Sequence, residues 1–295
     1  MSITRSLPAT FRNSSVRPGP VGLVGEGIRE ALSRRRLVWY LVRADLKKKG
    51  SDTLLGNVWW ILDPLLQMIV YVVFVSVIFA RSQPDYPLFI FSAILPWKWF
   101  NESVNDAISS VVSQQNLIKQ VQFPKIVLPL AATLAGVVDF TFGMVPLAAL
   151  LLLLYPDRIS WTLLLLPLIA VVQLTFSLAV DLVVSALNVF VRDVGNIARH
   201  ALRLWFYLSP GLYGLEQLDK SSMVRDFPLI GQVFRANPFA ILFESYRAVI
   251  YGTVEGGPRL PDWTSLGVLL AVSAVLVLLA MAFFKRLEPQ FAKVL

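Results

Sequence analysis

The sequence predicts an all-α polytopic membrane protein, and its composition and its apolar runs carry that prediction. Hydrophobic residues make up 56% of the 295 positions and charged residues only 16%, against about 25% in a typical soluble domain. Several apolar runs reach the roughly 20 residues that a helix needs to cross a bilayer. Runs of this length favour helices, because a spanning helix satisfies its own backbone hydrogen bonds inside lipid.

We expect six membrane-spanning helices within a transmembrane domain over residues 57–290. The fifth is irregular, because Pro210 and Gly211 fall where a helix would still lie inside the bilayer. Two short re-entrant helices are therefore expected in the outer leaflet within residues 209–262, before the last span. The six spans are placed near residues 57–80, 88–113, 127–154, 161–190, 195–213 and 264–284.

Basic residues are concentrated before the first span, where residues 1–56 contain eleven Lys and Arg against four acidic residues. Because Lys and Arg stay on the cytoplasmic side, an even number of spans places both termini in the cytoplasm, including the C-terminal residues 291–295. Residues 1–36 are expected to form a flexible basic tail. Residues 37–56 are expected to form an amphipathic helix on the membrane surface. The positive charge indicates anionic membrane lipids as partners, and not nucleic acid.

The chain offers little for catalysis or metal binding. It has no cysteine and a single histidine, His200, which excludes thiolate metal sites and most histidine-based sites. No G-x-x-x-x-G-K-[ST] motif is present, so ATP hydrolysis is expected on a separate nucleotide-binding chain. We expect no catalytic residue, no metal and no cofactor in this chain, with ATP and Mg²⁺ held by the partner.

The second predicted span has two different faces at helical spacing. Trp97 and Phe100 lie on an apolar face, whereas Lys98, Glu102 and Asn105 lie on a polar one. A polar stripe inside a membrane usually faces other protein or a water-filled path. The stripe therefore indicates either a lining for a hydrophilic substrate or a Lys98–Glu102 pair that satisfies itself at an interface.

Aromatic residues gather toward the outer halves of the second and fifth spans. Aromatic rings stack well on sugar faces, but aromatic belts are also common at membrane interfaces, and the sequence leaves both interpretations open. The expected substrate path combines these aromatic residues with the polar stripe. Its candidates are Trp97, Lys98, Phe100, Glu102, Asn105, Trp205, Tyr207 and Tyr213.

Three isolated acidic residues, Asp63, Asp139 and Asp181, lie within apolar spans. A charge at the centre of a span costs about 2.5–3.5 kcal/mol on insertion scales, so such residues have either a function or a partner. A proton-coupled carrier would use them as titrating groups. Interhelical hydrogen bonding is the alternative, and the sequence favours it because no Arg or His partner within the spans is apparent.

Short motifs follow one another in a distinctive order: Arg43-Ala44-Asp45-Leu46-Lys47, Leu95-Pro96-Trp97-Lys98-Trp99-Phe100, Gln122-Phe123-Pro124-Lys125, Val191-Arg192-Asp193, Leu208-Ser209-Pro210-Gly211 and Asn237-Pro238-Phe239. Together they resemble the permease subunits of ATP-binding-cassette exporters for O-antigen, capsule and teichoic acid. The resemblance covers about residues 37–290. It departs from the family pattern at Lys49-Gly50, where an Arg-aromatic pair is common, and at Asp63, where Asn is common.

The resemblance implies roles for three segments. Residues 37–56 correspond to a gate helix, residues 114–126 to a coupling segment that docks on the ATPase, and Arg192-Asp193 to a second turn near that interface. The gate helix and lipid headgroup residues are Arg34, Arg35, Arg36, Trp39, Arg43, Lys47, Lys48 and Lys49. The ATPase-coupling residues are Leu117, Lys119, Gln122, Phe123, Pro124, Lys125, Arg192 and Asp193.

The resemblance also implies a homodimer of permeases in the bacterial cytoplasmic membrane, driven by two separate ATPase chains. The expected substrate is a lipid-linked polysaccharide, such as O-antigen, capsule, galactan or a teichoic-acid-like polymer, moved from the cytoplasmic to the outer side. A drug or small-lipid efflux permease of the same superfamily is the first alternative. A proton-coupled carrier is the second, and a membrane glycosyltransferase has no acidic metal-binding pair on a cytoplasmic loop to support it.

Overall fold

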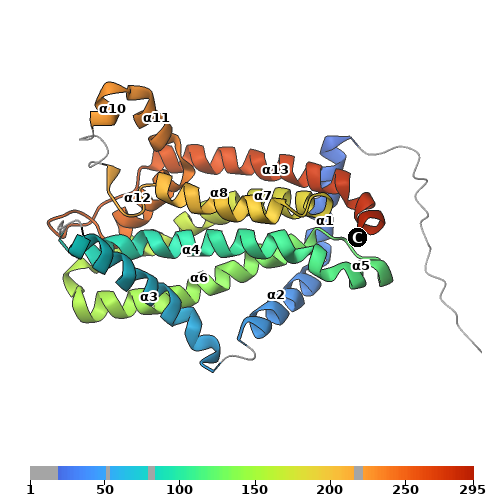
Figure 1. Cartoon of the computed structure of the whole chain (residues 1–295), viewed down its shortest axis with the longest axis horizontal. Helices are drawn as coiled ribbons and strands as arrows, with labels where there is room; N and C mark the ends of the chain where they lie inside the picture. The colour runs from blue at the N-terminus through green and yellow to red at the C-terminus, as the bar shows by residue number, and fades with distance from the viewer. Residues whose placement is uncertain (1–18, 51–53, 79–83, 216–221) are drawn as a thin grey trace, which may run out of the picture.

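The computed structural model describes residues 19–50, 54–78, 84–215 and 222–295, and every regular element in these ranges is a helix (Figure 1). The all-α prediction is therefore confirmed for the described residues. The helices are α1 (Pro20–Ser33), α2 (Arg35–Gly50), α3 (Trp59–Val73), α4 (Tyr86–Ser110), α5 (Gln115–Gln120), α6 (Val127–Leu154), α7 (Leu166–Phe190), α8 (Val194–Leu208), α10 (Ser222–Asp226), α11 (Pro228–Ala236), α12 (Pro238–Ile250) and α13 (Trp263–Val294). Short 3₁₀ or π turns are η1 (Gly56–Val58), η2 (Phe74–Ile78), η3 (Val112–Gln114), η4 (Pro156–Arg158) and η5 (Trp161–Leu165).

Four helical segments among the described residues are long and apolar enough to cross a membrane. The second predicted span is α4, whose 25 residues would extend about 38 Å. It is outside this group, and it contains many polar and charged side chains, such as Lys98, Asn101 and Glu102. The fifth is α8, which has only 15 residues and ends before Pro210. Six crossings therefore remain a prediction. The four segments are Trp59–Ser76, Val127–Leu154, Trp161–Phe190 and Trp263–Val294.

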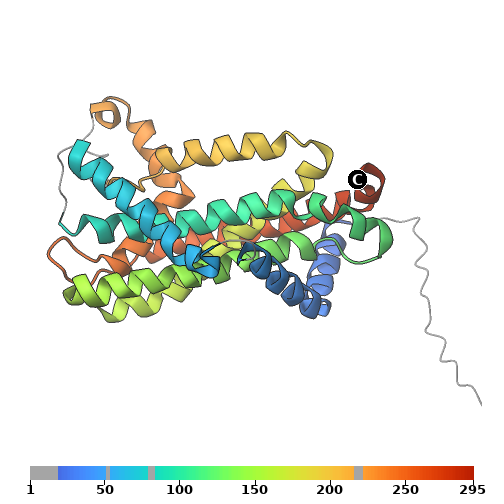
Figure 2. The same ribbon diagram turned by 60° about the horizontal axis from the view of Figure 1, so that its bottom comes forward.

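The bundle is organised around α4. Helices α3, α6, α7, α8 and α12 all pack against α4, and α13 runs along α7 on the other side (Figure 1). Figure 2 shows α2 and α3 meeting on one flank of the bundle. Helix α5 and the C-terminus lie at one end of the long axis, which we call the α5 end, and α10, α11 and α12 lie at the other, the α12 end (Figure 1).

The apolar face of α4 is buried in an aromatic core near the α12 end. The Trp97 ring lies 4.8 Å from Phe239 and the Phe100 ring 4.7 Å from Phe239, measured between centroids. Trp205 also packs on this cluster, 5.7 Å from Phe100. Large buried rings dominate core energetics, so these three residues are used for helix packing. This differs from the expectation that Trp97, Phe100 and Trp205 face a substrate.

Part of the expected flexible tail is the helix α1, which packs along α13. The approach is close at Gly27, where a Cβ atom would lie 2.8 Å from Cγ of Met281. The Lys285 ammonium lies 2.7 Å from the Glu30 carboxylate. These contacts explain why this segment is ordered against the bundle. Residues 1–18 of the expected tail lie outside the described residues.

Gly136 allows the close approach of α6 to α4. A Cβ atom there would lie 2.8 Å from Cδ1 of Trp99, which is buried. We expect Gly136→Ala to destabilise the protein by about 1–3 kcal/mol, because overpacking forces rigid neighbours to move. Thermal unfolding of the detergent-solubilised variant measures this effect.

Gly267 in α13 is the matched control, because nothing lies within 4 Å of the position of an added Cβ atom. Gly267→Ala should be neutral or stabilising, since Ala has the higher helix propensity by about 1 kcal/mol. Equal melting temperatures for the two variants would contradict the packing account.

Candidate functional site

The polar face of α4 borders two cavities. One cavity, of about 380 Å³, is lined by residues of α2, α3, α4 and α6, and we call it the central cavity. The other, of about 410 Å³, lies beside it toward the α5 end and includes Ser109, Ser110 and Ser113, and we call it the serine cavity. Lys49 and Asp106 line both cavities. The polar stripe expected on the second span therefore faces space that water or a polar substrate could occupy.

Lys98 joins α3 and α4 at the central cavity. Its ammonium lies 2.7 Å from the Glu102 carboxylate and 3.2 Å from the Asp63 carboxylate. The self-satisfying Lys98–Glu102 pair is thus present, and it also gives Asp63 a partner. Exposed pairs of this kind contribute about 0–1 kcal/mol, so this one positions the carboxylates more than it stabilises the fold.

Lys49 is directed into the bundle instead of toward lipid headgroups. Its ammonium lies 2.7 Å from Asp106, 2.8 Å from Asp139 and 3.5 Å from Asp45, so α2, α4 and α6 meet at one cation. The reason is the Asp139 side chain, which is only 9% exposed. A nearly buried carboxylate is costly unless a positive charge lies close to it.

Asp181 is fully buried and accepts two hydrogen bonds from other helices. The hydroxyls of Ser103 and Thr133 donate to its Oδ2 atom at 2.5 and 2.7 Å. Asp63, Asp139 and Asp181 therefore each have a polar partner on a different helix. The interhelical bonding that the sequence analysis set against a titrating role is therefore present at all three residues.

The helix expected over residues 37–56 corresponds to α2, which begins at Arg35 and ends earlier than expected, at Gly50. Residues 51–53 lie outside the described residues, and Gly56 begins the 3₁₀ turn η1. Val38 and Val42 are buried, and α2 packs on α6. On the exposed side next to these valines, the Arg43 guanidinium lies 5.4 Å from the Trp39 ring, a cation–π distance. The remaining headgroup candidates are exposed: Arg34, Arg35, Arg36, Lys47 and Lys48.

The expected coupling segment forms a ridge at the α5 end. Leu117 and Gln122 are exposed, whereas Phe123 is half-buried against the core beneath. The Lys119 ammonium donates to the Leu295 carbonyl at 2.6 Å. The Lys125 backbone N–H donates to Glu288 at 2.6 Å. Pro124 is half-buried. The segment is therefore bound to the C-terminal part of the chain through Lys119 and Lys125, while Leu117 and Gln122 remain exposed.

The turn with Arg192 and Asp193 lies at this same end, with both residues exposed. The side-chain amide of Asn188, just before the turn, donates to the carbonyl of Ile108 near the end of α4 at 2.8 Å. Gly195, just after the turn, also packs on Ile108. The two segments to which the resemblance assigns an ATPase interface therefore lie at the same end of the bundle, and the turn contacts the last part of α4.

Two buried arginines at the α12 end were missed by the sequence analysis. Arg158 lies 2.6 Å from Asp85 and donates to the carbonyls of Tyr251, Thr253 and Val254. An arginine in a short loop between spans looks like an ordinary solvated charge, so only the tertiary contacts reveal this role.

Arg247 holds the start of the expected re-entrant region. It donates to the carbonyls of Gly211 and Tyr213 at 2.5 and 3.2 Å and covers the Phe89 ring at 3.9 Å. The Tyr213 side chain is half-buried, and Tyr207 on α8 is exposed. Of the aromatic path candidates, Tyr207 is therefore the most accessible, although it does not line the central cavity.

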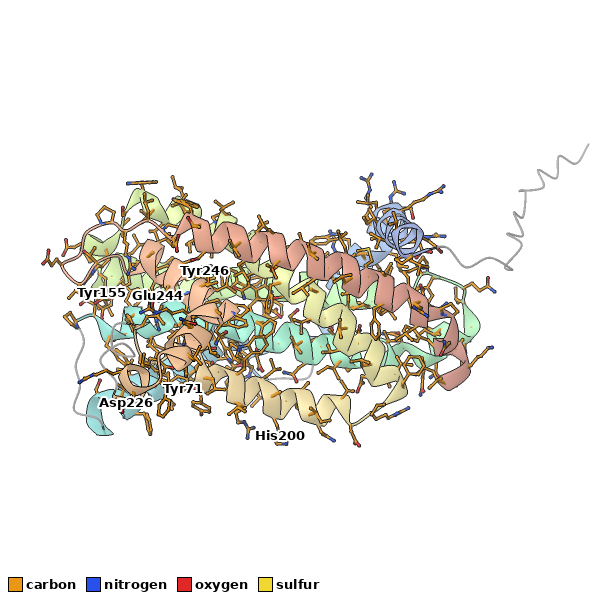
Figure 3. The ribbon with its side chains drawn as sticks, turned by 90° about the horizontal axis from the view of Figure 1, so that it is seen from above. Tyr71, Tyr155, His200, Asp226, Glu244 and Tyr246 are labelled. Carbon is orange, nitrogen blue, oxygen red and sulfur yellow. The ribbon has the colours of Figure 1, made fainter. Side chains whose placement is uncertain are left out.

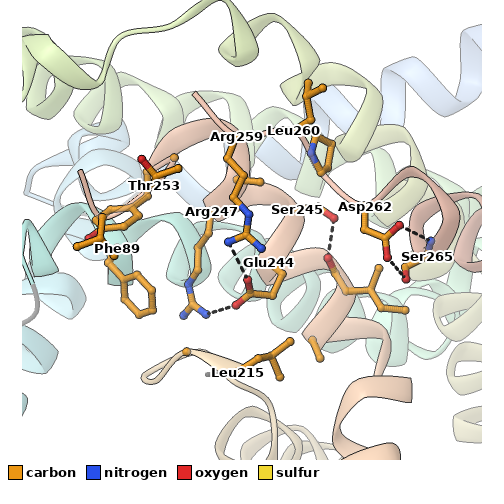
Figure 4. A pocket seen from close by; sticks show the side chains of 18 of the residues that line it. Phe89, Leu215, Glu244, Ser245, Arg247, Thr253, Arg259, Leu260, Asp262 and Ser265 are labelled. Carbon is orange, nitrogen blue, oxygen red and sulfur yellow. Dashed lines mark hydrogen bonds and ion pairs between the residues drawn. The ribbon is translucent and has the colours of Figure 1, made fainter. Parts of the chain in front are cut away.

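A cavity of about 740 Å³ lies at the α12 end (Figure 4). Glu244 lies between two of its lining arginines, 3.3 Å from Arg247 and 3.7 Å from Arg259. Figure 3 places Glu244 at this end and His200 on the outer side of α8. Among the described residues, no group of three or more His, Cys, Asp or Glu side chains could hold a metal ion.

Comparison with known proteins identifies the class of protein. The sequence pattern of the ABC-2 type transporter family matches residues 36–251. The chain is 34% identical to the O-antigen export system permease protein RfbA of Myxococcus xanthus over 266 residues, covering 90% of this chain and 98% of the relative. It is 26% identical to a protein of the same name from Klebsiella pneumoniae, covering 88% of this chain and 95% of the relative. The chain therefore belongs to the ABC-2 type transporter family.

Removing the Lys49 charge should destabilise the bundle. We expect Lys49→Met to cost about 1–3 kcal/mol, below the ~3–5 kcal/mol of a fully buried broken pair because Lys49 remains partly exposed. The cost arises because Asp106 and Asp139 lose their shared cation. Thermal unfolding in detergent measures it.

The second variant Lys49→Met/Asp139→Asn should recover part of that loss, because it also removes the least exposed carboxylate. Lys47→Met is the control, since Lys47 is exposed on the same helix. If Lys47→Met and Lys49→Met unfold at the same temperature, Lys49 does not stabilise the junction of α2, α4 and α6.

Proposed function

We propose that this chain is the membrane-spanning subunit of an ATP-driven exporter that moves a lipid-linked polysaccharide to the outer side of the bacterial cytoplasmic membrane. The observation that carries the proposal is the central cavity, a polar space within a largely apolar bundle, in a chain similar to O-antigen export permeases. ATP hydrolysis is assigned to a separate chain, because this one has no P-loop sequence.

The lining of the central cavity suits a hydroxyl-rich polymer. Glu102 and Asn105 offer hydrogen-bond acceptors and donors, and Trp59 and Trp60 lie at the same cavity. Trp59 is 39% exposed, and in the proposal it takes the stacking role considered for Trp97, Phe100 and Trp205. The Trp60 ring lies 4.9 Å from the Phe142 ring and packs on it.

Basic residues place the α5 end in the cytoplasm in this proposal. The positive-inside rule assigns Lys and Arg in short loops to that side. Lys119, Lys125 and Arg192 lie in the two turns at this end, and the C-terminus lies there as well. The exposed basic face of α2 would lie against anionic headgroups. The Arg158 and Arg247 clusters would then hold the loops of the outer side.

Transport would require two copies of this chain and two ATPase chains. Closure of the ATPases would push on the ridge formed by Leu117 and Gln122, and α2 would shift relative to α6. The polar faces of α4 from the two copies would together enclose a path for the polymer. A drug or small-lipid efflux permease shares the general plan but does not need the charged lining of the central cavity.

The test is gentle solubilisation from native membranes, followed by identification of the proteins that remain bound. The proposal predicts a stoichiometric partner with a P-loop, whose ATP hydrolysis is stimulated by lipid-linked glycan. A homo-oligomer without an ATPase, under conditions that preserve comparable complexes, would contradict it. Stimulation by small lipids or drugs, but not by glycan, would favour the efflux alternative.

Leu117, an exposed apolar residue of the coupling segment, provides a more specific prediction. Leu117 is 36% exposed in α5, as expected for a side chain that inserts into a partner. Leu117→Asp should reduce ATPase binding and glycan-stimulated hydrolysis by about tenfold or more, because a carboxylate in an apolar interface loses its water. Co-purification and ATPase rates measure both effects.

Leu117→Met is the conservative control and should behave like the unaltered protein. Melting temperature must stay unchanged in both variants, because the side chain is at the surface. If Leu117→Asp binds the ATPase and couples normally, α5 is not the docking element.

A further inference from the structure

Lys285 is a nearly buried cation at the α5 end of α13, outside both polar cavities. Its ammonium lies 2.6 Å from Glu288, 2.7 Å from Glu30 and 3.5 Å from Glu26, and its side chain is 7% exposed. Glu30 and Glu26 belong to α1, so this cluster joins the first described helix to the last. Burial raises the pKa of the Glu30 carboxyl, and Lys285 acts in the opposite direction.

Glu288 carries the connection onward to the coupling segment. Its side chain is 8% exposed, and its second oxygen accepts a hydrogen bond from the Lys125 backbone N–H at 2.6 Å. Lys125 lies within the coupling segment, two residues before the start of α6. One carboxylate therefore contacts both Lys285 and the backbone that a docked ATPase would displace.

On its other side, α1 is joined directly to the gate helix. Only Arg34 separates α1 from α2, and its backbone N–H continues the hydrogen bonding of α1 by donating to the Glu30 carbonyl at 3.0 Å. The next turn follows at once, since Leu37 N–H donates to the Arg34 carbonyl at 2.8 Å. A displacement of α1 at Glu30 must therefore move the start of α2.

Stability alone is a weak reason for this cluster. Replacing a buried ion pair by apolar side chains of similar size is often neutral or stabilising, whereas fixing one arrangement of elements is a better attested role for such groups. Gly27 and Met281 already provide close apolar packing between α1 and α13. The charged side chains add a continuous series of ion pairs and a hydrogen bond that links α1, through α13, to the backbone of the coupling segment.

We propose that Lys285 and Glu288 are positioning residues that transmit a displacement of the coupling segment through α1 to the gate helix α2. The path runs from the Lys125 backbone to Glu288, then through Lys285 to Glu30, and along α1 into α2. This inference rests on the proposed function, because it assigns α1 a part in coupling ATP hydrolysis to export.

The experiment uses the full complex with its ATPase in proteoliposomes and compares basal with glycan-stimulated hydrolysis. Lys285→Met and Glu30→Gln should each lower the stimulation about fivefold or more. Fivefold is about the lower limit of the effect that coupling between two sites typically has. Basal hydrolysis and ATPase binding should remain. Glu26→Gln is the matched control and should retain full stimulation, because Glu26 makes the longer contact.

A flexible insertion separates transmission from simple anchoring. Four residues, Gly-Ser-Gly-Ser, placed after Ser33 leave the α1–α13 contacts intact but break the rigid junction with α2. The proposal predicts a loss of stimulation like that of Glu30→Gln, with an unchanged melting temperature. Full stimulation in the insertion variant, or in both charge variants, would overturn it.

Measurements on the unaltered complex distinguish a failure of this inference from a failure of the proposed function. If glycan does not stimulate hydrolysis even in the unaltered complex, the proposed function fails, and the role of α1 fails with it. If glycan stimulates the unaltered complex and the insertion variant equally, only the relay through α1 is wrong.

Discussion

Helix α4 has to satisfy charged side chains on one face and aromatic side chains on the other, and the remaining helices are arranged around that requirement. The aromatic face is covered by α12, α7 and α8, with Trp97 and Phe100 at its centre. The charged face is covered only in part, by α2, α3 and α6. Charges near an apolar interior need partners, so the pairs made by Lys49 and Lys98 determine where α2 and α3 can lie.

This asymmetry links the fold to transport. A bundle that buried α4 on all sides would have no polar surface within the membrane, whereas the incomplete cover leaves the central and serine cavities open beside it. Lys49 of α2 borders both cavities. The same helix is connected through α1 to the α5 end. In the proposed function, the substrate path and the docking surface therefore share α2 as a common element.

The sequence predicted the features that depend on local pattern. Apolar run lengths located α6, the end of α7 and the start of α13 closely, whereas α13 extends ten residues beyond the predicted span, to Val294. Helical spacing separated the two faces of α4. The serial order of short motifs identified the family, since no single motif would be specific enough. These predictions succeeded because periodicity and run length reflect the environment of a helix directly.

Features that depend on distant partners were missed or misplaced. Lys49 looks like Lys47 and Lys48 in the sequence, but only Lys49 reaches Asp139, which lies 90 residues away along the chain. The burial of Arg158 and the docking of α1 on α13 likewise depend on residues far apart in the chain. Trp97 of α4 and Trp205 of α8 could equally have faced a substrate, and only the position of Phe239 decides that their rings pack against the core.

The central claim is that the polar face of α4 lines a water-accessible path, and cysteine accessibility tests it most directly. The chain contains no cysteine, so each single substitution gives an unambiguous signal. Glu102→Cys, Asn105→Cys and Ser109→Cys in native membranes should react with a small charged thiol reagent, whereas Phe100→Cys and Val104→Cys should not. Labelling that is absent from the polar positions, or equal on both faces of α4, would contradict the account.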